Sequence, residues 1–570
     1  MMKKKYLLLL AILIFASFLR FYQLGNNPPS LTWDEAAWGY NAYSIGIDGR
    51  DEFGRFLPLD YLESFGDFKP PMYAYLDIIP VKLLGLNEFS TRFPSAFFGV
   101  LTVLLTYFLV KRIFWKSKLK ESYALMSALI LAISPWHIML SRAAFEANVA
   151  TFFIVLGVFL FLVAVNSVKS QVAASFPPQG WKPIYTLRLR FLLLLSLSVV
   201  SFILSMYTFN TARVVAPLLI LGLAIGFRKE LFDRKKEVVL ASLSGLIMII
   251  PLAQFILTPQ ASLRFKEVNI FSDINIIKTA NQEIANDNNA FWSKAIHNRR
   301  LVYGVEYLKH YFDNLSPNFL FIKGDGNPKF SIQEVGQMYL WDLPFLVIGA
   351  FFIFRKKEGY WWIIPAWLVL AIIPAATARE TPHALRIETV LPTFQILTAY
   401  GFVHFIGMIS NIKYQISKIQ IKYLIFFLSF LFLLFNFLYY YHDYLVHYPR
   451  IYSGEWQYGY RESIKYVSNV YNQYDLIEVT TDLGRPYIYY LFYTKKDPKE
   501  FRKTADVKRE VFGFVNVKGY DKYRFLKDLK VVPNKKILYV NSASNTPASA
   551  KILKIFNLLN GKSTIIIYTL

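Results

Sequence analysis

The chain has 570 residues, of which 55% are hydrophobic and 18% aromatic, and its mean hydropathy is +0.33. These values exclude an ordinary soluble domain and indicate that much of the chain lies in a lipid bilayer. The net charge of +24 does not indicate a nucleic-acid partner, because much of it falls in short connectors between apolar segments, and the absence of cysteine excludes disulfides and thiolate chemistry.

A membrane-spanning helix needs roughly 20 mostly apolar residues. By this criterion we predict a mainly α, polytopic membrane protein with about eleven spans, at 6–24, 92–110, 122–140, 147–166, 191–207, 214–227, 238–257, 341–354, 361–376, 387–409 and 423–440. The first span follows three lysines and could instead be a cleaved signal peptide. The many later spans, and the lack of a clear small-x-small cleavage site, favour a retained anchor.

The distribution of lysine and arginine predicts the orientation. If the N-terminus is cytoplasmic, the short connectors on that side carry 23 of these residues and those on the other side carry 8. The positive-inside rule therefore places the N-terminus in the cytoplasm, and eleven spans then place the C-terminus outside. On this topology, 1–440 forms the membrane domain, with extracytoplasmic loops at 25–91 and 258–340, and 441–570 forms an extracytoplasmic domain.

The tail from residue 441 has the pattern of a small α/β domain. Strand-like runs occur at 476–480, 536–540 and 564–568, and a helical pattern at 460–472 precedes them.

An acidic pair, Asp34 and Glu35, follows the first apolar segment. Thr32 and Glu35 have the spacing of a capping box, so we expect a short helix to begin there with Glu35 bonded to its first N–H groups. Asp34 is then the freer carboxylate, and the early helix position favours its ionised form, as a general base requires. We take Asp34 and Glu35 as candidate catalytic acids; the alternative is a solvated pair that only caps the helix.

Lys69 lies in the same loop and precedes two prolines. Pro70 disfavours a helical backbone at the lysine, whereas Pro71 can occupy the first turn of a following helix, so the ammonium is expected at a helix entrance. Lysine and a helix N-terminus both attract phosphate. Lys69 is therefore a candidate phosphate-binding residue; the alternative is a lysine that snorkels to lipid headgroups.

Two more pairs lie at the predicted outer ends of spans. Arg142 and Glu146 have i, i+4 spacing and are either a simple helix ion pair or a second acidic element of the site. The Thr-Pro pair at 381–382 predicts a helix start, which would place His383 and Arg386 on one face. Both could bind phosphate there, or anchor to lipid headgroups.

The order of these motifs resembles a known family. An apolar anchor is followed by Trp33-Asp34-Glu35, by Lys69-Pro70-Pro71, and by Ser90-Thr91-Arg92-Phe93-Pro94-Ser95 at the start of the next span. This order is similar to that of GT-C membrane glycosyltransferases related to protein O-mannosyltransferases and to the aminoarabinose transferase that acts on lipid A (glycosyltransferase family 39-like). The resemblance is strongest over roughly residues 1–165 and extends to 383–392.

The resemblance implies an enzyme that transfers a sugar, with inversion, from a polyprenyl-phosphate donor to an extracytoplasmic protein, lipid or glycan. The acid of the family's loop corresponds to Asp34, as general base or acceptor-orienting group. The lysine of its Lys-Pro-Pro motif corresponds to Lys69, which would hold the leaving phosphate. Glu146 corresponds to a later acidic position, and Arg386 to a second phosphate contact.

The same resemblance leaves metal dependence open. In the lipid A enzymes an acidic residue directly precedes the lysine and helps to bind a metal. Here Phe68 stands in that place and Asp67 lies one residue earlier, so a divalent ion at Asp67 is conceivable. The seven histidines have no strong metal-ligand spacing, and no cofactor is implied with certainty.

A transporter or flippase for a lipid-linked glycan is the main alternative function. Charged residues deep in spans mark transport paths, whereas the notable acids here lie where loops meet helices, which favours chemistry at the membrane surface. A noncatalytic scaffold with a ligand-binding tail is a third interpretation, but it leaves Asp34 and Lys69 without a role.

Overall fold

The computed structural model describes residues 2–172, 183–259, 261, 268–410, 416–509 and 515–570. The chain forms two compact units, each built from segments that are distant in the sequence. The first comprises Met1–Leu19, Phe98–Leu140 and Glu146–Tyr440; the second comprises Arg20–Phe97, Ser141–Phe145 and Tyr441–Leu570. The second unit thus combines most of the predicted first loop with the predicted α/β tail.

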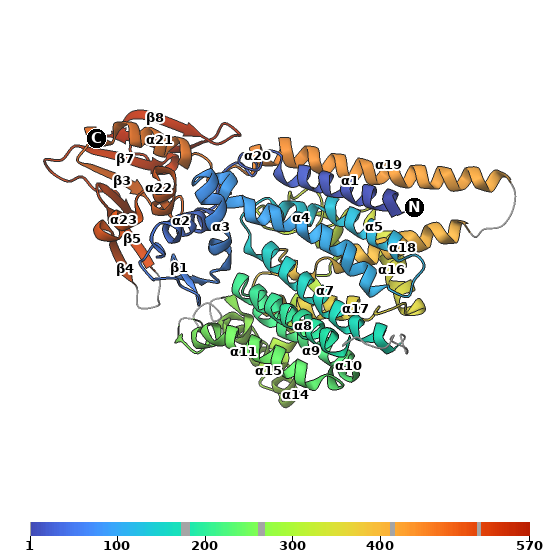
Figure 1. Cartoon of the computed structure of the whole chain (residues 1–570). Helices are drawn as coiled ribbons and strands as arrows, with labels where there is room; N and C mark the ends of the chain where they lie inside the picture. Colours follow the sequence, from blue (N-terminus) through green and yellow to red (C-terminus); the bar gives the residue numbers. More distant parts are fainter. Residues whose placement is uncertain (1, 173–182, 260, 262–267, 411–415, 510–514) are drawn as a thin grey trace. The chain divides into compact units, whose positions relative to one another are not determined.

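The first unit is helical (Figure 1). The helices that lie wholly or partly in it are α1 (Met2–Phe21), α4 (Glu88–Ile113), α5 (Lys120–Ile133), α6 (Pro135–Ser141), α7 (Glu146–Val172), α8 (Pro183–Thr208), α9 (Ala212–Gly226), α10 (Arg228–Phe232), α11 (Lys235–Ile256), α13 (Ile274–Asn286), α14 (Phe291–Ile296), α15 (Arg299–Asp313), α16 (Asp342–Lys356), α17 (Ile363–Ile372), α18 (Thr393–Ser410) and α19 (Ile416–Val446). Short helical turns are η1 (Ile270–Ser272), η2 (Asn318–Ile322), η3 (Ala375–Thr377) and η4 (Glu388–Val390).

Helices occupy all eleven segments predicted as spans, but they differ in length. Within the described residues, 5 helices are long and apolar enough to cross a membrane: Glu88–Ile113, Glu146–Ser167, Arg188–Thr208, Lys235–Ile256 and Tyr423–Ile451. The pair α5 and α6, bent by 57°, raises this number to 6. Shorter apolar helices occur at Ala212–Gly226, Ile363–Thr377 and Thr393–Ile409. The chain is therefore a multi-pass membrane protein, and the count of eleven stays a prediction.

The predicted helix start at 381–382 is wrong. Residues 381–387 form turns, and the next long helix, α18, begins only at Thr393. The reason is tertiary: the His383 N–H donates to Asn314 Oδ1 at 3.0 Å, and the Ala384 N–H donates to Asp325 Oδ2 at 2.6 Å. In a helix, the Thr381 side chain would have capped these first-turn N–H groups. Here the Thr381 hydroxyl donates instead to Asp313 Oδ2 at 3.0 Å, and side chains from another segment take the place of the cap.

Helices α16 and α18 approach each other through glycine. A Cβ atom on Gly349 would lie 1.9 Å from the carbonyl oxygen of Leu397, and one on Gly401 would lie 1.9 Å from that of Phe345. No larger residue fits either position, so the two backbones meet directly, which is how small residues drive helix association in membranes.

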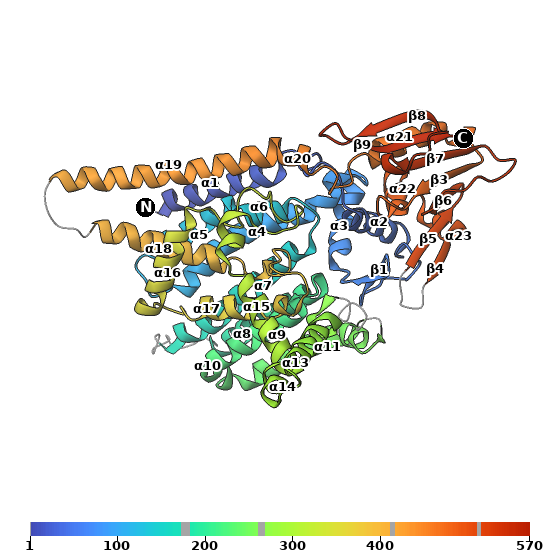
Figure 2. The ribbon, with the colours of Figure 1, turned by 180° about the vertical axis from the view of Figure 1, so that it is seen from behind.

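The second unit contains a seven-stranded mixed sheet in the order β4-β5-β6-β3-β7-β9-β8, with β3 parallel to both β6 and β7 (Figure 2). The strands are β3 (Leu476–Thr480), β4 (Asp506–Arg509), β5 (Val515–Tyr520), β6 (Tyr523–Leu526), β7 (Ile537–Ser542), β8 (Lys551–Asn557) and β9 (Ser563–Thr569). The helical elements are α2 (Trp33–Asp48), α3 (Met72–Leu84), α20 (Tyr448–Ile451), α21 (Tyr460–Val470), η5 (Tyr471–Gln473), α22 (Pro486–Thr494), α23 (Pro498–Thr504) and η6 (Ala543–Asn545). The α/β character predicted for the tail is confirmed.

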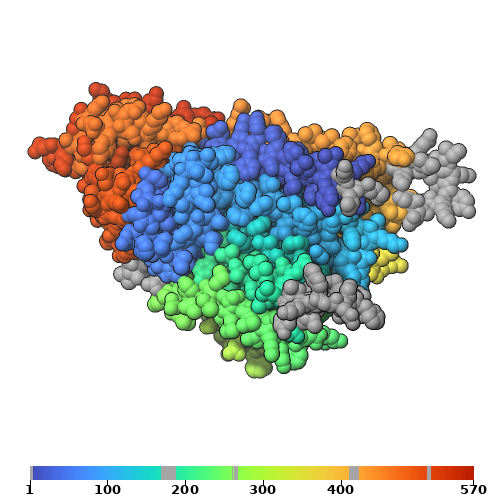
Figure 3. Space-filling view, in the orientation of Figure 1, coloured from blue at the N-terminus to red at the C-terminus, as the bar shows by residue number. Residues whose placement is uncertain are grey.

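The core of the second unit joins α2 to this α/β sheet domain. Buried side chains of α2, α21, α22 and the sheet form one hydrophobic cluster. The Tyr40 hydroxyl on α2 donates to the Lys496 carbonyl at 3.0 Å, and the Tyr489 hydroxyl on α22 donates to the Leu31 carbonyl at 3.1 Å. In the space-filling view, the blue surface of the segment after α1 adjoins the orange surface of the C-terminal residues (Figure 3). The N-terminal loop and the tail therefore fold as one body.

Candidate active site

Asp34 is positioned by the first turn of α2. The predicted capping box is present: the Thr32 hydroxyl accepts from the Glu35 N–H at 3.3 Å, and Glu35 Oε2 accepts from the Thr32 N–H at 2.9 Å. Glu35 is fully buried, whereas the Asp34 side chain is 51% exposed. Of the two carboxylates, that of Asp34 is therefore the more exposed.

Lys69 is positioned by a hairpin that the sequence did not predict. Strands β1 (Leu62–Ser64) and β2 (Asp67–Lys69) pair antiparallel, with Lys69 opposite Leu62. Pro71 is the N-cap of α3, so the lysine lies in the strand two residues before that cap. The hairpin, rather than the helix entrance alone, fixes the direction of the lysine side chain.

The hairpin turn has an unusual backbone. Phe65 and Gly66 both have positive φ, 61° and 79°, as a two-residue turn between strands requires. A bulky residue such as phenylalanine rarely adopts this conformation. The Phe65 ring lies 4.7 Å from the Arg485 guanidinium carbon and 5.7 Å from the Tyr487 ring, so the start of α22 holds it in place.

Asp34 and Lys69 form an ion pair across these two elements. The Lys69 ammonium contacts Asp34 Oδ1, and it lies 5.2 Å from the Trp38 ring centroid and 5.3 Å from that of Phe65. The lysine side chain is 8% exposed, so the charge is held between two aromatic faces while its carboxylate partner faces outward. A carboxylate and an ammonium at one opening can take up a proton and hold an anion.

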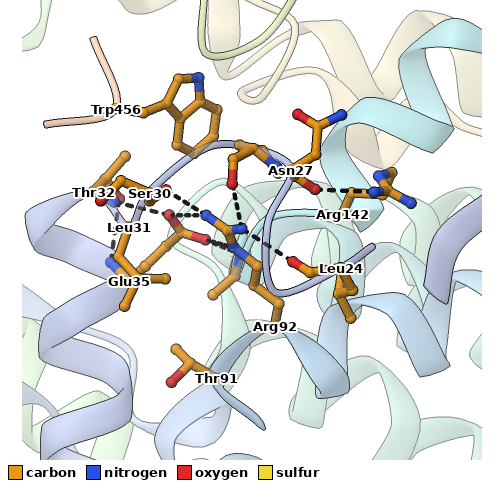
Figure 4. A network of polar contacts seen from close by, with 12 residues as sticks. Leu24, Asn27, Ser30, Leu31, Thr32, Glu35, Thr91, Arg92, Arg142 and Trp456 are labelled. Carbon is orange, nitrogen blue, oxygen red and sulfur yellow. Dashed lines mark hydrogen bonds and ion pairs between the residues drawn. The ribbon is translucent and has the colours of Figure 1, made fainter. Parts of the chain in front are cut away.

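Glu35 lies in a separate buried network (Figure 4). Its Oε1 accepts from Arg92 Nε at 2.9 Å and from the Ala144 N–H at 2.9 Å. The fully buried Arg92 guanidinium also donates to the carbonyl oxygens of Leu24, Pro28 and Ser30. The carboxylate is surrounded by donors of its own chain, which favours the capping role over a catalytic one.

Arg142 lies in the same network (Figure 4). It donates to the carbonyl oxygens of Tyr22 at 2.8 Å and Asn27 at 2.9 Å, and its Nε donates to the Tyr444 hydroxyl at 3.2 Å. The chain is not helical between Ser141, where α6 ends, and Glu146, where α7 begins. The helical i, i+4 arrangement considered for Arg142 and Glu146 is therefore absent.

Glu146, His383 and Arg386 belong to the first unit. Glu146 begins α7 and interacts electrostatically with the fully buried Glu388. The Arg386 guanidinium donates to the Glu380 carbonyl oxygen at 3.1 Å and lies 3.8 Å from its carboxylate. Within the second unit the structure thus brings Asp34 and Lys69 together, while these three residues lie in a different unit.

His383 is neutral at physiological pH. Burial and, to a smaller extent, the neighbouring Arg386 together lower its pKa to about 3. Its Nδ1 accepts from the Arg386 N–H at 3.4 Å, and Asp325 Oδ2 is 3.9 Å away. A cationic phosphate contact by this histidine has no support, although a neutral ring can still donate one hydrogen bond.

Among the described residues, Asp67, the residue suggested for a metal, does not belong to a cluster of metal ligands. In the part of the chain that the structure describes, no group of three or more His, Cys, Asp or Glu side chains is arranged to hold a metal ion. Asp67 lies in β2 on the strand that carries Lys69, opposite Ser64. No step of the chemistry below depends on a metal.

Sequence reasoning did not single out Arg92 or Glu388 as individual residues. Each falls at the start of a segment predicted to span the membrane, at 92–110 and at 387–409. An ionisable residue in such a segment is costly unless it is paired or functional. This cost was the signal that could have drawn attention to both.

Part of the chain matches a known family. Residues 10–258 match the family model of the dolichyl-phosphate-mannose-protein mannosyltransferases. A protein of Aquifex aeolicus without assigned function is 36% identical over 162 residues, which is 28% of this chain and 29% of that protein's length. The resemblance found in the sequence motifs is thus confirmed by an independent comparison.

Comparison with solved structures shows the fold. The apo structure of ArnT from Cupriavidus metallidurans is similar with a TM-score of 0.50 at 11% identity, covering 99% of this chain and 97% of that one. The Archaeoglobus fulgidus oligosaccharyltransferase, tethered with an acceptor peptide, is similar with a TM-score of 0.51 at 13% identity, covering 86% and 63%. At these identities the likeness concerns the fold alone.

Proposed function

We propose that the chain is a membrane glycosyltransferase that uses a polyprenyl-phosphate sugar donor, because residues 10–258 match the model of the dolichyl-phosphate-mannose-protein mannosyltransferase family. The acceptor is a hydroxyl or similar nucleophile on an extracytoplasmic protein, lipid or glycan. The observation that carries the proposal is the ion pair between the outward-facing Asp34 and the enclosed Lys69. The carboxylate can accept the proton of the acceptor hydroxyl, and the ammonium can bind the phosphate that leaves.

In the proposed reaction, Asp34 accepts the proton of the acceptor hydroxyl as its oxygen attacks the anomeric carbon of the sugar. The bond from that carbon to the phosphate oxygen breaks, and the polyprenyl phosphate leaves with the electron pair. Lys69 holds the phosphate and stabilises the charge that develops on it. Attack from the face opposite the leaving group inverts the anomeric configuration.

The ion pair sets the order of events. While the Lys69 ammonium is bound to Asp34, it is not fully available to a phosphate, and the carboxylate is a weaker base. A donor phosphate that draws the ammonium to itself would release the carboxylate for the acceptor. Binding of donor would thus activate the base, and the acceptor would follow.

The remaining candidate residues have other roles in the proposed enzyme. Glu35 holds the start of α2 through Thr32 and Arg92 and acts on the reaction only by positioning Asp34. Arg386 and Glu146 stay candidates for a phosphate contact and a second acid. The eleven spans, the cytoplasmic N-terminus and the extracytoplasmic tail also belong to the proposal, supported by the asymmetry of positive residues.

The test is direct transfer by the purified protein in proteoliposomes. A polyprenyl-phosphate sugar labelled in the sugar should yield polyprenyl phosphate and a product of inverted anomeric configuration. A nucleotide sugar serves as the control donor and should give no transfer. Transfer from the nucleotide sugar, or a product with retained configuration, would contradict the proposal. Movement of intact donor across the bilayer without cleavage would favour a flippase instead.

A further inference from the structure

Glu52 is a second acid next to the Lys69 site. Its side chain is fully buried, and its Oε1 accepts from the Ser64 hydroxyl at 3.1 Å. Its N–H donates to Asn41 Oδ1 at 3.0 Å. Asn41 lies on α2 and Ser64 on β1, so Glu52 joins the helix that carries Asp34 to the hairpin that carries Lys69.

The surroundings of Glu52 keep its carboxyl group protonated. Burial, followed by the charge of the neighbouring Asp51, raises its pKa, which lies at about 8 when all the surrounding groups act together. The Ser64 hydrogen bond and the Lys69 ammonium lower the pKa, and Glu63 raises it. The opposing effects leave a neutral acid at pH 7 that ionises in the mildly alkaline range.

Two phenols complete the ionisable groups that act on Glu52. Burial raises the pKa of Tyr40 on α2 and that of Tyr487 on α22, so both stay neutral throughout the range in which Glu52 titrates. Glu52 Oε2 makes no hydrogen bond of good geometry within the described residues, although the Tyr487 phenol acts on the same carboxyl. A negative charge on Glu52 would be attracted by the Lys69 ammonium, which lowers the pKa of this carboxyl group.

The charge of Glu52 matters for a lysine that must bind phosphate. With Glu52 neutral, the ammonium shares its charge with Asp34 and can move to an incoming anion. With Glu52 ionised, a second carboxylate attracts the same ammonium and repels the anion. We propose that Glu52 is a positioning residue for Lys69, which fixes the lysine's hairpin against α2 through its hydrogen bonds with Asn41 and Ser64 and leaves the ammonium available to the donor phosphate. This inference rests on the proposed function.

The experiment is the pH dependence of the donor KM in proteoliposomes for the wild type and Glu52→Gln. Glutamine keeps the shape and can accept from Ser64, but it cannot ionise. The donor is a phosphodiester and does not titrate in this range. The wild-type donor KM should rise about threefold or more between pH 7 and pH 9, and Glu52→Gln should remove the rise without a comparable change in kcat.

Asp77→Asn is the matched control. Asp77 is also fully buried, burial raises its pKa well above the ordinary value, and it lies on α3 in the same unit. Unlike for Glu52, burial is the cause of this shift among the residues that the structure describes, with no contribution from a neighbouring charge. Asp77→Asn should therefore keep the alkaline rise in donor KM. The assignment would be overturned if the wild-type donor KM did not rise at alkaline pH, or if the rise persisted in Glu52→Gln. It would also be overturned if Asp77→Asn removed the rise.

A second readout does not need transfer. Because the pKa of Glu52 is higher in the folded than in the unfolded chain, folding takes up a proton at Glu52 between these two pKa values. The contribution of this group to stability is therefore present below its unfolded pKa and is lost as pH rises to about 8. Glu52→Gln should therefore gain melting temperature relative to the wild type between pH 5 and pH 8.5. Equal pH profiles of the melting temperature for the wild type and Glu52→Gln would contradict a protonated Glu52 in the folded protein. If neither the wild type nor a variant transfers sugar from a polyprenyl-phosphate donor, this result would instead contradict the proposed function and, with it, the role given to Glu52.

Discussion

Removal of the Arg92 guanidinium should destabilise the second unit severely. Arg92 is fully buried and bridges Glu35 to the carbonyl oxygens of Leu24, Pro28 and Ser30 (Figure 4). Arg92→Ala would leave the Glu35 carboxylate, itself fully buried, without its counterion. Breaking a buried ion pair in this way costs about 3–5 kcal/mol. The three carbonyl groups lose their donor as well, so the upper part of this range is expected.

The assay is thermal unfolding of the detergent-solubilised protein. A loss of about 4 kcal/mol corresponds to a fall in melting temperature of roughly 10 °C for a unit of this size. Arg461→Ala is the control, because Arg461 is 46% exposed and its ion pair with Glu88 lies at the surface. Such a pair contributes at most about 1 kcal/mol.

A double variant tests the cause. If the cost comes from an unpaired buried charge, adding Glu35→Gln to Arg92→Ala should recover about 1–2 kcal/mol, since glutamine carries no charge and can still bond to the Thr32 N–H. Equal stabilities for Arg92→Ala and Arg461→Ala, or a double variant that is less stable than Arg92→Ala, would refute this reasoning.

Two further predictions concern the phosphate site and the topology. Lys69→Ala should raise the donor KM roughly 30-fold, equivalent to about 2 kcal/mol for a lost charge-assisted contact; an unchanged KM in well-folded variant would exclude the lysine from the site. In this cysteine-free chain, a cysteine at the exposed position Asn560 should react with an impermeant reagent from outside, and one at the exposed Lys118 should not. The opposite labelling would overturn the orientation.

Local signals predicted the fold well. The capping box at Thr32 and Glu35 depends on residues three apart, so the start of α2 could be read directly. The strand-like runs at 476–480 and 564–568 became β3 and β9, and helices occupy the apolar segments. The start at 381–382 failed because the Thr381 hydroxyl bonds to Asp313 and so does not cap a helix, and no local pattern reports such a distant partner.

The candidate site was only partly predictable. Composition and spacing identified Asp34 and Lys69, but the hairpin that aims the lysine has strands of three residues, too short for an alternating pattern, and a turn without the usual Asn-Gly sequence. Arg92 lies 57 residues from Glu35, so their pairing depends on tertiary structure. Glu52 escaped attention for the same reason, because burial, the largest cause of its raised pKa, depends on tertiary structure.

The most direct test of the central claim separates turnover from donor binding at Asp34. Asp34→Asn keeps the shape of the side chain and its place in the first turn of α2 but removes the base. Transfer from a polyprenyl-phosphate sugar in proteoliposomes should fall roughly 100-fold or more, while equilibrium binding of the labelled donor should be retained because Lys69 is still present. Near-normal turnover by Asp34→Asn would contradict the account.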